Sequence, residues 1–232
     1  ANTCKATGKL IPNGAKWLRT RVTSLQPEHN QVTLEDGQSL SYQFLVVAPG
    51  LELNLGAIAG LENSLGKHGV TSNYLFELAP YTWECVQQLK RGRALFTQPP
   101  MPIKCAGAPQ KAMYLSGDHW LRSGVLDNID IEFCNAGGVL FGVKDYVPAP
   151  EEYVERYHAR LSFMHNLAKV DGPAKKAWFT VTDAEGNRQT VEKDFDMIHV
   201  VPPQTAPDFI RVSPLADAAG WVDVDQNTLR HK

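Results

Sequence analysis

The order of apolar and amphipathic segments between residues 93 and 165 constrains the fold of this chain most. Short strand-like runs in this region alternate with segments whose apolar residues recur at helical spacing. The expected strands are 94–97, 129–133 and 160–164, and the expected helices are 108–123 and 150–160. Strands that alternate with helices in this way form parallel sheets with the helices packed on their faces. The sequence therefore predicts an α/β fold.

Antiparallel strands are expected before and after this layer. Residues 12–47 contain several short β-type runs, and Asp36-Gly37 between two of them is typical of a hairpin turn. The last of these runs, 42–47, is apolar throughout, as expected of a strand covered on both faces. A second hairpin is expected over 178–192, and a last strand over 221–224. We therefore predict a β-meander and a hairpin as additions to the parallel sheet.

Composition and charge exclude several classes of function. The chain has 232 residues, 43% hydrophobic and 21% charged, with a formal net charge of −2. A nucleic-acid partner would require a basic surplus, so none is expected. The four cysteines show no CxxC or Cys/His ligand spacing, which predicts neither a zinc site nor a disulfide framework; they stand at 4, 85, 105 and 134. No apolar run approaches the 18 residues typical of a membrane-spanning helix.

Cys105 is the candidate reactive group, because it stands between an expected strand and an expected helix. Small residues follow it, and Pro109 fits the first turn of a helix, where no backbone donor is needed. A thiol in front of a helix N-terminus and beside cations such as Lys104 and Lys111 is favoured as the reactive thiolate. The local pattern alone is equally compatible with a buried structural cysteine. His68 and His119 could act as bases, but packed or solvated histidines are the ordinary interpretation of both.

Two further segments could bind a cofactor. The stretch 135–142 follows an expected strand, but its glycines at 137, 138 and 142 do not have the spacing of a dinucleotide fingerprint. We interpret it as part of a nicotinamide-type fold that has lost its nucleotide, and a plain strand-to-helix turn is the commoner alternative. The apolar run 44–47 ends in Ala48-Pro49-Gly50, and the carboxyl ends of strands in open α/β sheets are where ligands bind.

Four stretches of the chain together resemble the sulfide:quinone oxidoreductases of the eukaryotic mitochondrial type. This family lies within the two-dinucleotide-domain flavoprotein superfamily of pyridine nucleotide-disulfide oxidoreductases. The stretches are Ile11–Thr23, Tyr42–Gly50, Ile103–Ser116 and Ser213–Val224. The second half of the last stretch, Ala-Asp-Ala-Ala-Gly-Trp-Val-Asp-Val, and the stretch around Cys105 are long enough to be specific. The resemblance extends over essentially the whole chain.

The resemblance implies two Rossmann-like domains, of which the FAD-binding domain is incomplete. Residues 1–55 match the middle of the FAD domain, with its β-meander and cofactor loop. Residues 56–205 match the second, nicotinamide-like domain, which in this family binds no NAD(P)H. Residues 206–232 match the return into the FAD domain. The family's opening glycine fingerprint would precede residue 1, so the resemblance predicts an internal segment that by itself binds little flavin and is inactive.

The resemblance also implies site residues. The backbone of Val22 would meet the adenine part of FAD, and the loop Ala48-Pro49-Gly50 would pass the cofactor. Cys105 matches one of two redox-active cysteines, and the other would follow residue 232. Lys111 matches as well, and we expect it to support the thiolate or the reduced flavin electrostatically. Where relatives carry a glutamate proposed for proton transfer, this chain has Asn63, with Glu62 beside it.

The activity implied by the resemblance is the oxidation of hydrogen sulfide. Sulfide attacks the oxidised cysteine pair, one cysteine becomes a persulfide, and the other passes electrons to FAD. A membrane ubiquinone accepts the electrons, and a small thiol such as glutathione accepts the sulfur. The implied location is the mitochondrial inner membrane, reached through a docking segment that this sequence does not contain. Cys4, Cys85 and Cys134 do not match the second redox cysteine and are interpreted as structural.

Two alternatives to this function stay open. The first is a flavin-dependent NADH:quinone reductase of the same superfamily, which an intact phosphate fingerprint near residue 135 would favour. The second belongs to another class, a non-catalytic, fragmentary homologue.

Overall fold

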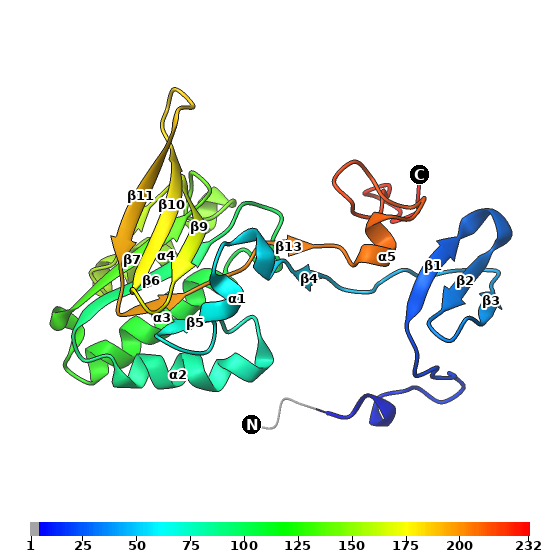
Figure 1. The fold of residues 1–232 in the computed structure, drawn as a ribbon, viewed down its shortest axis with the longest axis horizontal. Helices are drawn as coiled ribbons and strands as arrows, with labels where there is room; N and C mark the ends of the chain where they lie inside the picture. The colour runs from blue at the N-terminus through cyan, green and yellow to red at the C-terminus, as the bar shows by residue number, and fades with distance from the viewer. Residues whose placement is uncertain (1–4) are drawn as a thin grey trace. The chain divides into compact units, whose positions relative to one another are not determined.

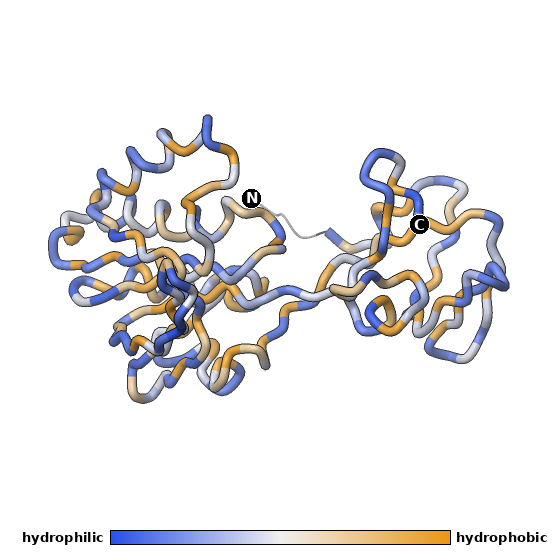
Figure 2. Tube along the Cα trace, turned by 90° about the horizontal axis from the view of Figure 1, so that it is seen from above, coloured by the Kyte–Doolittle hydropathy of each residue, from blue (hydrophilic) through white to orange (hydrophobic). Residues whose placement is uncertain are grey.

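The computed structural model describes residues 5–232, which divide into two compact units. Of the described residues, one unit comprises 5–52 and 205–232, and the other comprises 53–204. The chain passes from one unit to the other and back through a two-stranded sheet, formed by β4 (Glu52–Leu53) and β13 (Gln204–Thr205). In both units, short hydrophobic stretches alternate along the trace with hydrophilic loops (Figure 2).

The unit of residues 53–204 is built on a five-stranded sheet in which neighbouring strands pair in parallel. The strands follow one another across the sheet in the order β5, β12, β6, β7, β8, and Figure 1 labels β5, β6 and β7. Their bounds are β5 (Val70–Thr71), β6 (Gly92–Gln98), β7 (Ile129–Asn135), β8 (Arg160–Ser162) and β12 (Met197–His199). The parallel α/β layer expected from the sequence is thereby confirmed.

Helices cover one face of this sheet, and a second sheet covers the other. The helices on this face are α2 (Ala79–Gln88), α3 (Ala108–Arg122) and α4 (Pro148–Arg156). The short helix α1 (Leu61–Ser64) lies on the opposite face, where Leu61 packs in the same cluster as Leu95. The second sheet is antiparallel, in the order β11 (Arg188–Asp194), β10 (Lys176–Thr182), β9 (His165–Asp171). Successive residues of a strand point to opposite faces. Accordingly, Phe96 packs in the cluster with Trp120 of α3, while Leu95 packs in the cluster with Phe179 of β10.

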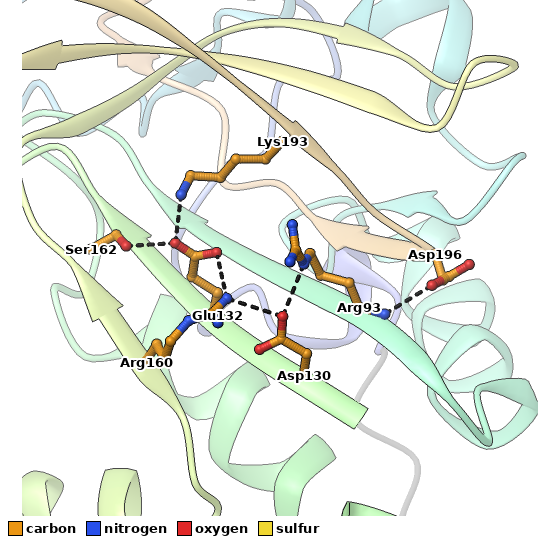
Figure 3. A network of polar contacts seen from close by, with 7 residues as sticks. All are labelled: Arg93, Asp130, Glu132, Arg160, Ser162, Lys193 and Asp196. Carbon is orange, nitrogen blue, oxygen red and sulfur yellow. Dashed lines mark hydrogen bonds and ion pairs between the residues drawn. The ribbon is translucent and has the colours of Figure 1, made fainter. Parts of the chain in front are cut away.

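A network of charged side chains joins four strands of this unit and is shown in Figure 3. At its centre lies Glu132 of β7, whose side chain is only 4% exposed. Lys193 of β11 contacts one carboxylate oxygen at 2.7 Å, and Arg160 of β8 contacts the other at 3.1 Å. Burial disfavours the charge, but the hydrogen bonds from Lys193 and Ser162 outweigh burial, so the pKa of Glu132 lies below its ordinary value. The carboxylate is therefore ionised and fully paired.

The other unit contains a small antiparallel sheet and one short helix. The elements are β1 (Val22–Gln26), β2 (Gln31–Leu34), β3 (Ser39–Ser41) and α5 (Asp208–Arg211). Gly37 adopts φ +83° in the turn between β2 and β3, and the Asp36 carboxylate accepts the backbone N–H of Gln38 at 3.0 Å. Leu25, Val32 and Ile210 form the centre of its core. The predicted meander is present.

Two predicted strands of this unit are wrong. Residues 42–47 form no strand, and Phe44 and Val46 are 92% and 89% exposed. An apolar run becomes a buried strand only where neighbouring strands hydrogen-bond to it, and no strand of residues 5–232 pairs with this run. Residues 221–224 form only isolated bridges, Ala216 with Val222 and Val224 with His231.

Short 3-10 helices complete the secondary structure of the described residues. They are η1 (Thr7–Lys9), η2 (Pro27–His29), η3 (Leu55–Ala57), η4 (Phe76–Leu78), η5 (Leu126–Asn128) and η6 (Lys144–Tyr146). Within residues 5–232, no helix combines the length and the apolar character needed to cross a bilayer.

Candidate functional site

The carboxyl edge of the parallel sheet has one topological switch point, between β6 and β12. From β6 the chain proceeds through α3 to β7 on one side, while β12 lies on the other side of β6. Ligand sites of open α/β sheets form outside such a point. The loop that leaves β6 here comprises residues 99–107 and contains Cys105. The sheet therefore brings Cys105 to the position where this fold places its chemistry.

This loop, and not the stretch 135–142, is where a dinucleotide fingerprint would stand. In dinucleotide-binding sheets the fingerprint follows the strand at the switch point, which here is β6. The stretch 135–142 follows the neighbouring strand, β7. The β6–α3 loop contains prolines at 99, 100 and 102 and a single glycine, Gly107. A phosphate loop needs several glycines so that its backbone can approach the pyrophosphate. The stretch 135–142 therefore does not follow the strand at the switch point, and the loop after β6, which does, is also unlike a phosphate loop.

The glycine-rich stretch after β7 has a structural role. Asn135 is fully buried, and its carboxamide donates to the Val139 carbonyl and accepts the Gly137 N–H, both at 2.8 Å. The Gln110 carboxamide of α3 donates to the Leu140 carbonyl. The Tyr114 hydroxyl donates to Gln110 at 3.0 Å, so the stretch also steadies the first turn of α3. These contacts agree with the alternative interpretation of the stretch as a plain turn after a strand.

Cys105 itself is exposed and has a left-handed backbone, with φ +61°. Its carbonyl accepts the Ala108 N–H at 2.9 Å, and α3 begins at Ala108. The positive end of the helix dipole thus lies three residues from the thiol, where it favours an anion. Lys104 and Lys111 flank the thiol in sequence, both are exposed, and neither pairs with a carboxylate of residues 5–232.

Both backbone polar groups of Lys104, the residue directly before Cys105, are held by hydrogen bonds. The Tyr74 hydroxyl donates to the Lys104 carbonyl at 3.0 Å, and the Lys104 N–H donates to the Gln204 carboxamide at 2.5 Å. Burial raises the pKa of Tyr74 to about 12, and the nearby charge of Cys105 contributes in the same direction. The phenol therefore stays protonated and remains a donor at neutral pH.

Tyr74 is connected to the sheet through its neighbour. The Asn73 N–H donates to Nε2 of His199 at 3.1 Å, and the Asn73 carboxamide lies 2.9 Å from the same nitrogen. His199 belongs to β12 and is completely buried, and burial lowers its pKa to about 4. The imidazole is therefore neutral at pH 7 and can accept this hydrogen bond. Its Nδ1 has no hydrogen-bond partner among the described residues.

The remaining cysteines and the candidate histidines do not join this site. Cys85 and Cys134 are buried, and burial raises the pKa of both thiols, which agrees with structural roles. No disulfide joins the cysteines between residues 5 and 232, and Cys4 lies outside the described residues. His119 stacks edge-on against Trp83 near the far end of α3, with ring centroids 4.8 Å apart. His68 lies in a loop and offers its carbonyl to Lys175 at 2.6 Å.

Val22 and the loop Ala48-Pro49-Gly50, which are expected to contact a cofactor, lie in the unit of residues 5–52 and 205–232. Val22 begins β1 and pairs with Leu34. The loop Ala48-Pro49-Gly50 is exposed, Gly50 adopts φ +82°, and no atom lies within 4 Å of a Cβ placed there. A flat ring system can therefore lie directly against this backbone, so the loop fits the expected cofactor contact. The contact itself stays a prediction.

Other predicted features give no further site. Asn63 and Glu62 are both exposed on α1. Within the chain from residue 5 to residue 232, no three His, Cys, Asp or Glu side chains are grouped as metal ligands.

Sequence reasoning missed Tyr74, Gln204 and His199, which hold the loop. Each contacts a group 30 to 126 positions away in the chain, so no local motif could reveal them. The only sequence signal was position, since Tyr74 follows β5 and Gln204 follows β12 by a few residues at the same edge of the sheet.

Comparison with solved structures gives the class of fold. The chain superimposes on the X-ray structure of the sulfide:quinone oxidoreductase of Aquifex aeolicus with a TM-score of 0.67 and 19% identity, covering 90% of this chain and 46% of that one. A chain of the mitochondrial ATP synthase structure of Tetrahymena thermophila gives a TM-score of 0.72 at 20% identity, covering 97% and 56%. At these identities the likeness is one of fold.

Sequence comparison is more specific. The mitochondrial sulfide:quinone oxidoreductase of Mus musculus is 39% identical over 228 residues, which is 98% of this chain and 50% of that protein. The protein of the same name from Dictyostelium discoideum is 42% identical over 223 residues, or 95% and 48%. No protein-family model matches the chain. The resemblance to mitochondrial sulfide:quinone oxidoreductases is confirmed, and the chain spans about half the length of the curated relatives it matches.

Proposed function

We propose that this chain is part of an FAD-dependent enzyme that oxidises hydrogen sulfide and transfers the electrons to a quinone. The observation that carries the proposal is the position of Cys105, an exposed thiol at the switch point of the sheet. The names of the relatives, which cover 95–98% of the chain, supply the substrates sulfide and quinone and the mitochondrial location. A ubiquinone of the inner membrane and a small thiol such as glutathione are the proposed acceptors of electrons and sulfur.

Cys105 is proposed to be one of the two redox-active cysteines that react with sulfide. In its oxidised form Cys105 shares a disulfide with a second cysteine, which the resemblance places outside this sequence. Hydrosulfide attacks one sulfur of the disulfide, a new S–S bond forms as the old one breaks, and the products are a persulfide and a thiolate. The sulfane sulfur then passes to the acceptor thiol. The residues of this chain assist because the helix dipole of α3 and the cations Lys104 and Lys111 favour an anionic sulfur here.

FAD is the proposed cofactor, and Val22 with the loop Ala48-Pro49-Gly50 is proposed to contact it. When bound, the flavin supplies two-electron redox chemistry between thiols and a quinone. The support from this chain is the exposed, open backbone at Gly50. Exposed backbone amides in this loop can donate hydrogen bonds to a polar group of the cofactor.

Two observations bear on the alternatives. The proline-rich loop after β6 does not favour an NADH:quinone reductase, because it lacks the glycines with which such folds bind the pyrophosphate. A chain within an ATP synthase structure shares this fold, so the fold by itself is compatible with a non-catalytic homologue. The exposed thiol of Cys105 favours the enzyme, because Tyr74 and Gln204 hold the backbone of the preceding residue, Lys104.

The test uses the protein expressed from its complete reading frame, with sulfide added in the absence of oxygen. We expect the flavin absorbance near 450 nm to bleach, on the order of one flavin per sulfide. The variant Cys105→Ser should not bleach, and Cys85→Ala, which removes a buried thiol, should bleach like the parent. Quinone reduction by Cys105→Ser at the parent rate would refute the role of Cys105.

A further inference from the structure

The backbone of Cys105 is strained in a way that needs an explanation. A left-handed conformation costs a residue with a side chain free energy, and it persists only where the surroundings impose it. The φ of +61° therefore identifies Cys105 as a residue whose conformation is fixed from outside. Its own carbonyl contact with Ala108 is a local turn and holds only the helix side of the residue.

The constraint on the other side is the backbone of Lys104. Tyr74 binds the Lys104 carbonyl, in the peptide group that joins Lys104 to Cys105, and Gln204 binds the Lys104 N–H, in the preceding peptide group. With both polar groups of one residue occupied, the rotation about the bonds that lead to Cys105 is restricted. Neither contact reaches the sulfur, so both residues act on the thiol through the backbone.

Both holding residues are themselves anchored to the same part of the sheet. Gln204 is 8% exposed and follows Pro202-Pro203, a few residues after the end of β12. The Pro203 carbonyl accepts the Asn54 N–H at 2.8 Å. Tyr74 follows Asn73, whose N–H is bound by the buried His199 of β12. The end of β12 thus positions both residues that hold the loop, and all of them belong to the unit of residues 53–204.

We propose that Tyr74 and Gln204 are positioning residues that hold the backbone of Lys104 and thereby keep the Cys105 thiol at the N-terminus of α3. The inference rests on the proposed function in that it gives the thiol a purpose. It concerns the reactivity of the thiol itself, which can be measured without sulfide, flavin turnover or quinone. Loss of either contact lets the Cys105 backbone relax away from the helix dipole, so the thiolate becomes less favoured.

The experiment measures alkylation of Cys105 by iodoacetamide on the reduced full-length protein, as a function of pH, with the labelled peptide identified by mass spectrometry. Tyr74→Phe and Gln204→Met each remove one contact at nearly constant volume. We expect the midpoint of the pH profile to rise in both and the rate at pH 7 to fall about fivefold, the equivalent of one modest hydrogen bond. At high pH, where the thiolate is complete in every variant, the rates of parent and variants should converge.

The matched control is Tyr81→Phe, because the Tyr81 hydroxyl also makes one 3.0 Å hydrogen bond to backbone, from the Gly69 N–H. It should leave the alkylation profile at its parent position. In the double variant of Tyr74 and Gln204, the fold-loss of the alkylation rate should be smaller than the product of the two single fold-losses, because both residues hold the backbone of the same residue, Lys104.

Parent-like profiles in Tyr74→Phe and Gln204→Met would overturn the inference, as would an equal shift in Tyr81→Phe. The proposed function fails separately, if Cys105→Ser still oxidises sulfide. A shifted alkylation profile in the two variants together with an active Cys105→Ser would leave the positioning in place and refute the catalytic role.

Discussion

The network around Glu132 and the loop around Cys105 treat charge in opposite ways, although both belong to the unit of residues 53–204. Glu132 is buried, and all its cationic neighbours are engaged with it or with Asp130 (Figure 3). At Cys105 the group that can become anionic is exposed, and its neighbours Lys104 and Lys111 pair with no carboxylate of the described chain. Paired buried charge fixes a structure, whereas unpaired cations beside a thiol remain available to an anion.

The largest effect is expected for Lys193, the cation that binds Glu132 in the buried network. Lys193→Met should destabilise the protein by about 3 kcal/mol, because it leaves the buried Glu132 carboxylate with Arg160 as its remaining cation. Urea unfolding followed by circular dichroism measures this, and the thiol reactivity of Cys105 in the folded protein should not change. A loss below about 0.5 kcal/mol would show that the network contributes little and would remove the contrast.

Acidification should affect the two regions in different pH windows. His199 has its folded pKa lowered to about 4 from an ordinary 6.5, so the unfolded chain binds the proton first and stability falls as the pH drops from 6.5 towards 4. This amounts to about 2 kcal/mol between pH 7 and pH 5. The contribution of Glu132, whose folded pKa is also lowered, is present above about 4.5 and is lost only below it.

Unfolding free energies measured from pH 7 to pH 5 test this. The variant His199→Gln should lose most of the pH dependence in this window. An unchanged slope would mean that His199 is not the group responsible.

The strain at Cys105 should be visible in stability. Cys105→Gly should be more stable than Cys105→Ala by about 1 kcal/mol, because glycine adopts a positive φ without steric cost. The control is Ala106→Gly. The φ of Ala106 is not positive, so this variant should instead destabilise the protein slightly. Thermal unfolding measures both, and an alanine variant as stable as the glycine variant would show that the left-handed backbone is relaxed in solution.

The smallest effect on stability is expected for Lys111→Met. The side chain is exposed and unpaired in the described chain, so the free energy of unfolding should change by less than about 0.5 kcal/mol. The alkylation rate of Cys105 at pH 7 should nevertheless fall severalfold, because a cation near the thiolate is lost. Raising the salt concentration should reduce the difference between parent and variant. A salt-independent difference would point to a steric cause.

The alternation of strands and helices made most of the larger unit predictable from the sequence. The run 94–97 is mostly apolar because it is covered on both faces, whereas 129–133 alternates apolar and acidic residues, and its apolar residues pack in one cluster. Both patterns can be recognised locally. The run 42–47 is apolar like 94–97 and forms no strand, because strand formation also requires partners that hydrogen-bond to it. Apolar character alone does not specify those partners.

The candidate site was only half predictable. Cys105 could be found because its signal is local, a thiol followed by small residues and a helix with Pro109 in its first turn. Tyr74 and Gln204 could not, since their contacts close 30 and 100 residues of chain and depend on the strand order of the sheet. The same strand order was needed to see that the loop after β6, and not the stretch 135–142, lies at the switch point.

The dependence of the Cys105 loop on Gln204 has a consequence for synthesis. During translation the thiol emerges from the ribosome about 100 residues before the side chain that completes its support, and β12, which carries His199, arrives just before Gln204. Until then the Lys104 N–H lacks Gln204 as its acceptor, and the segment of Tyr74 lacks its anchor His199, so we expect Cys105 to react as an ordinary cysteine. The chain thus gains its reactive thiol only when the second unit is nearly complete, which limits premature side reactions of a nascent polypeptide.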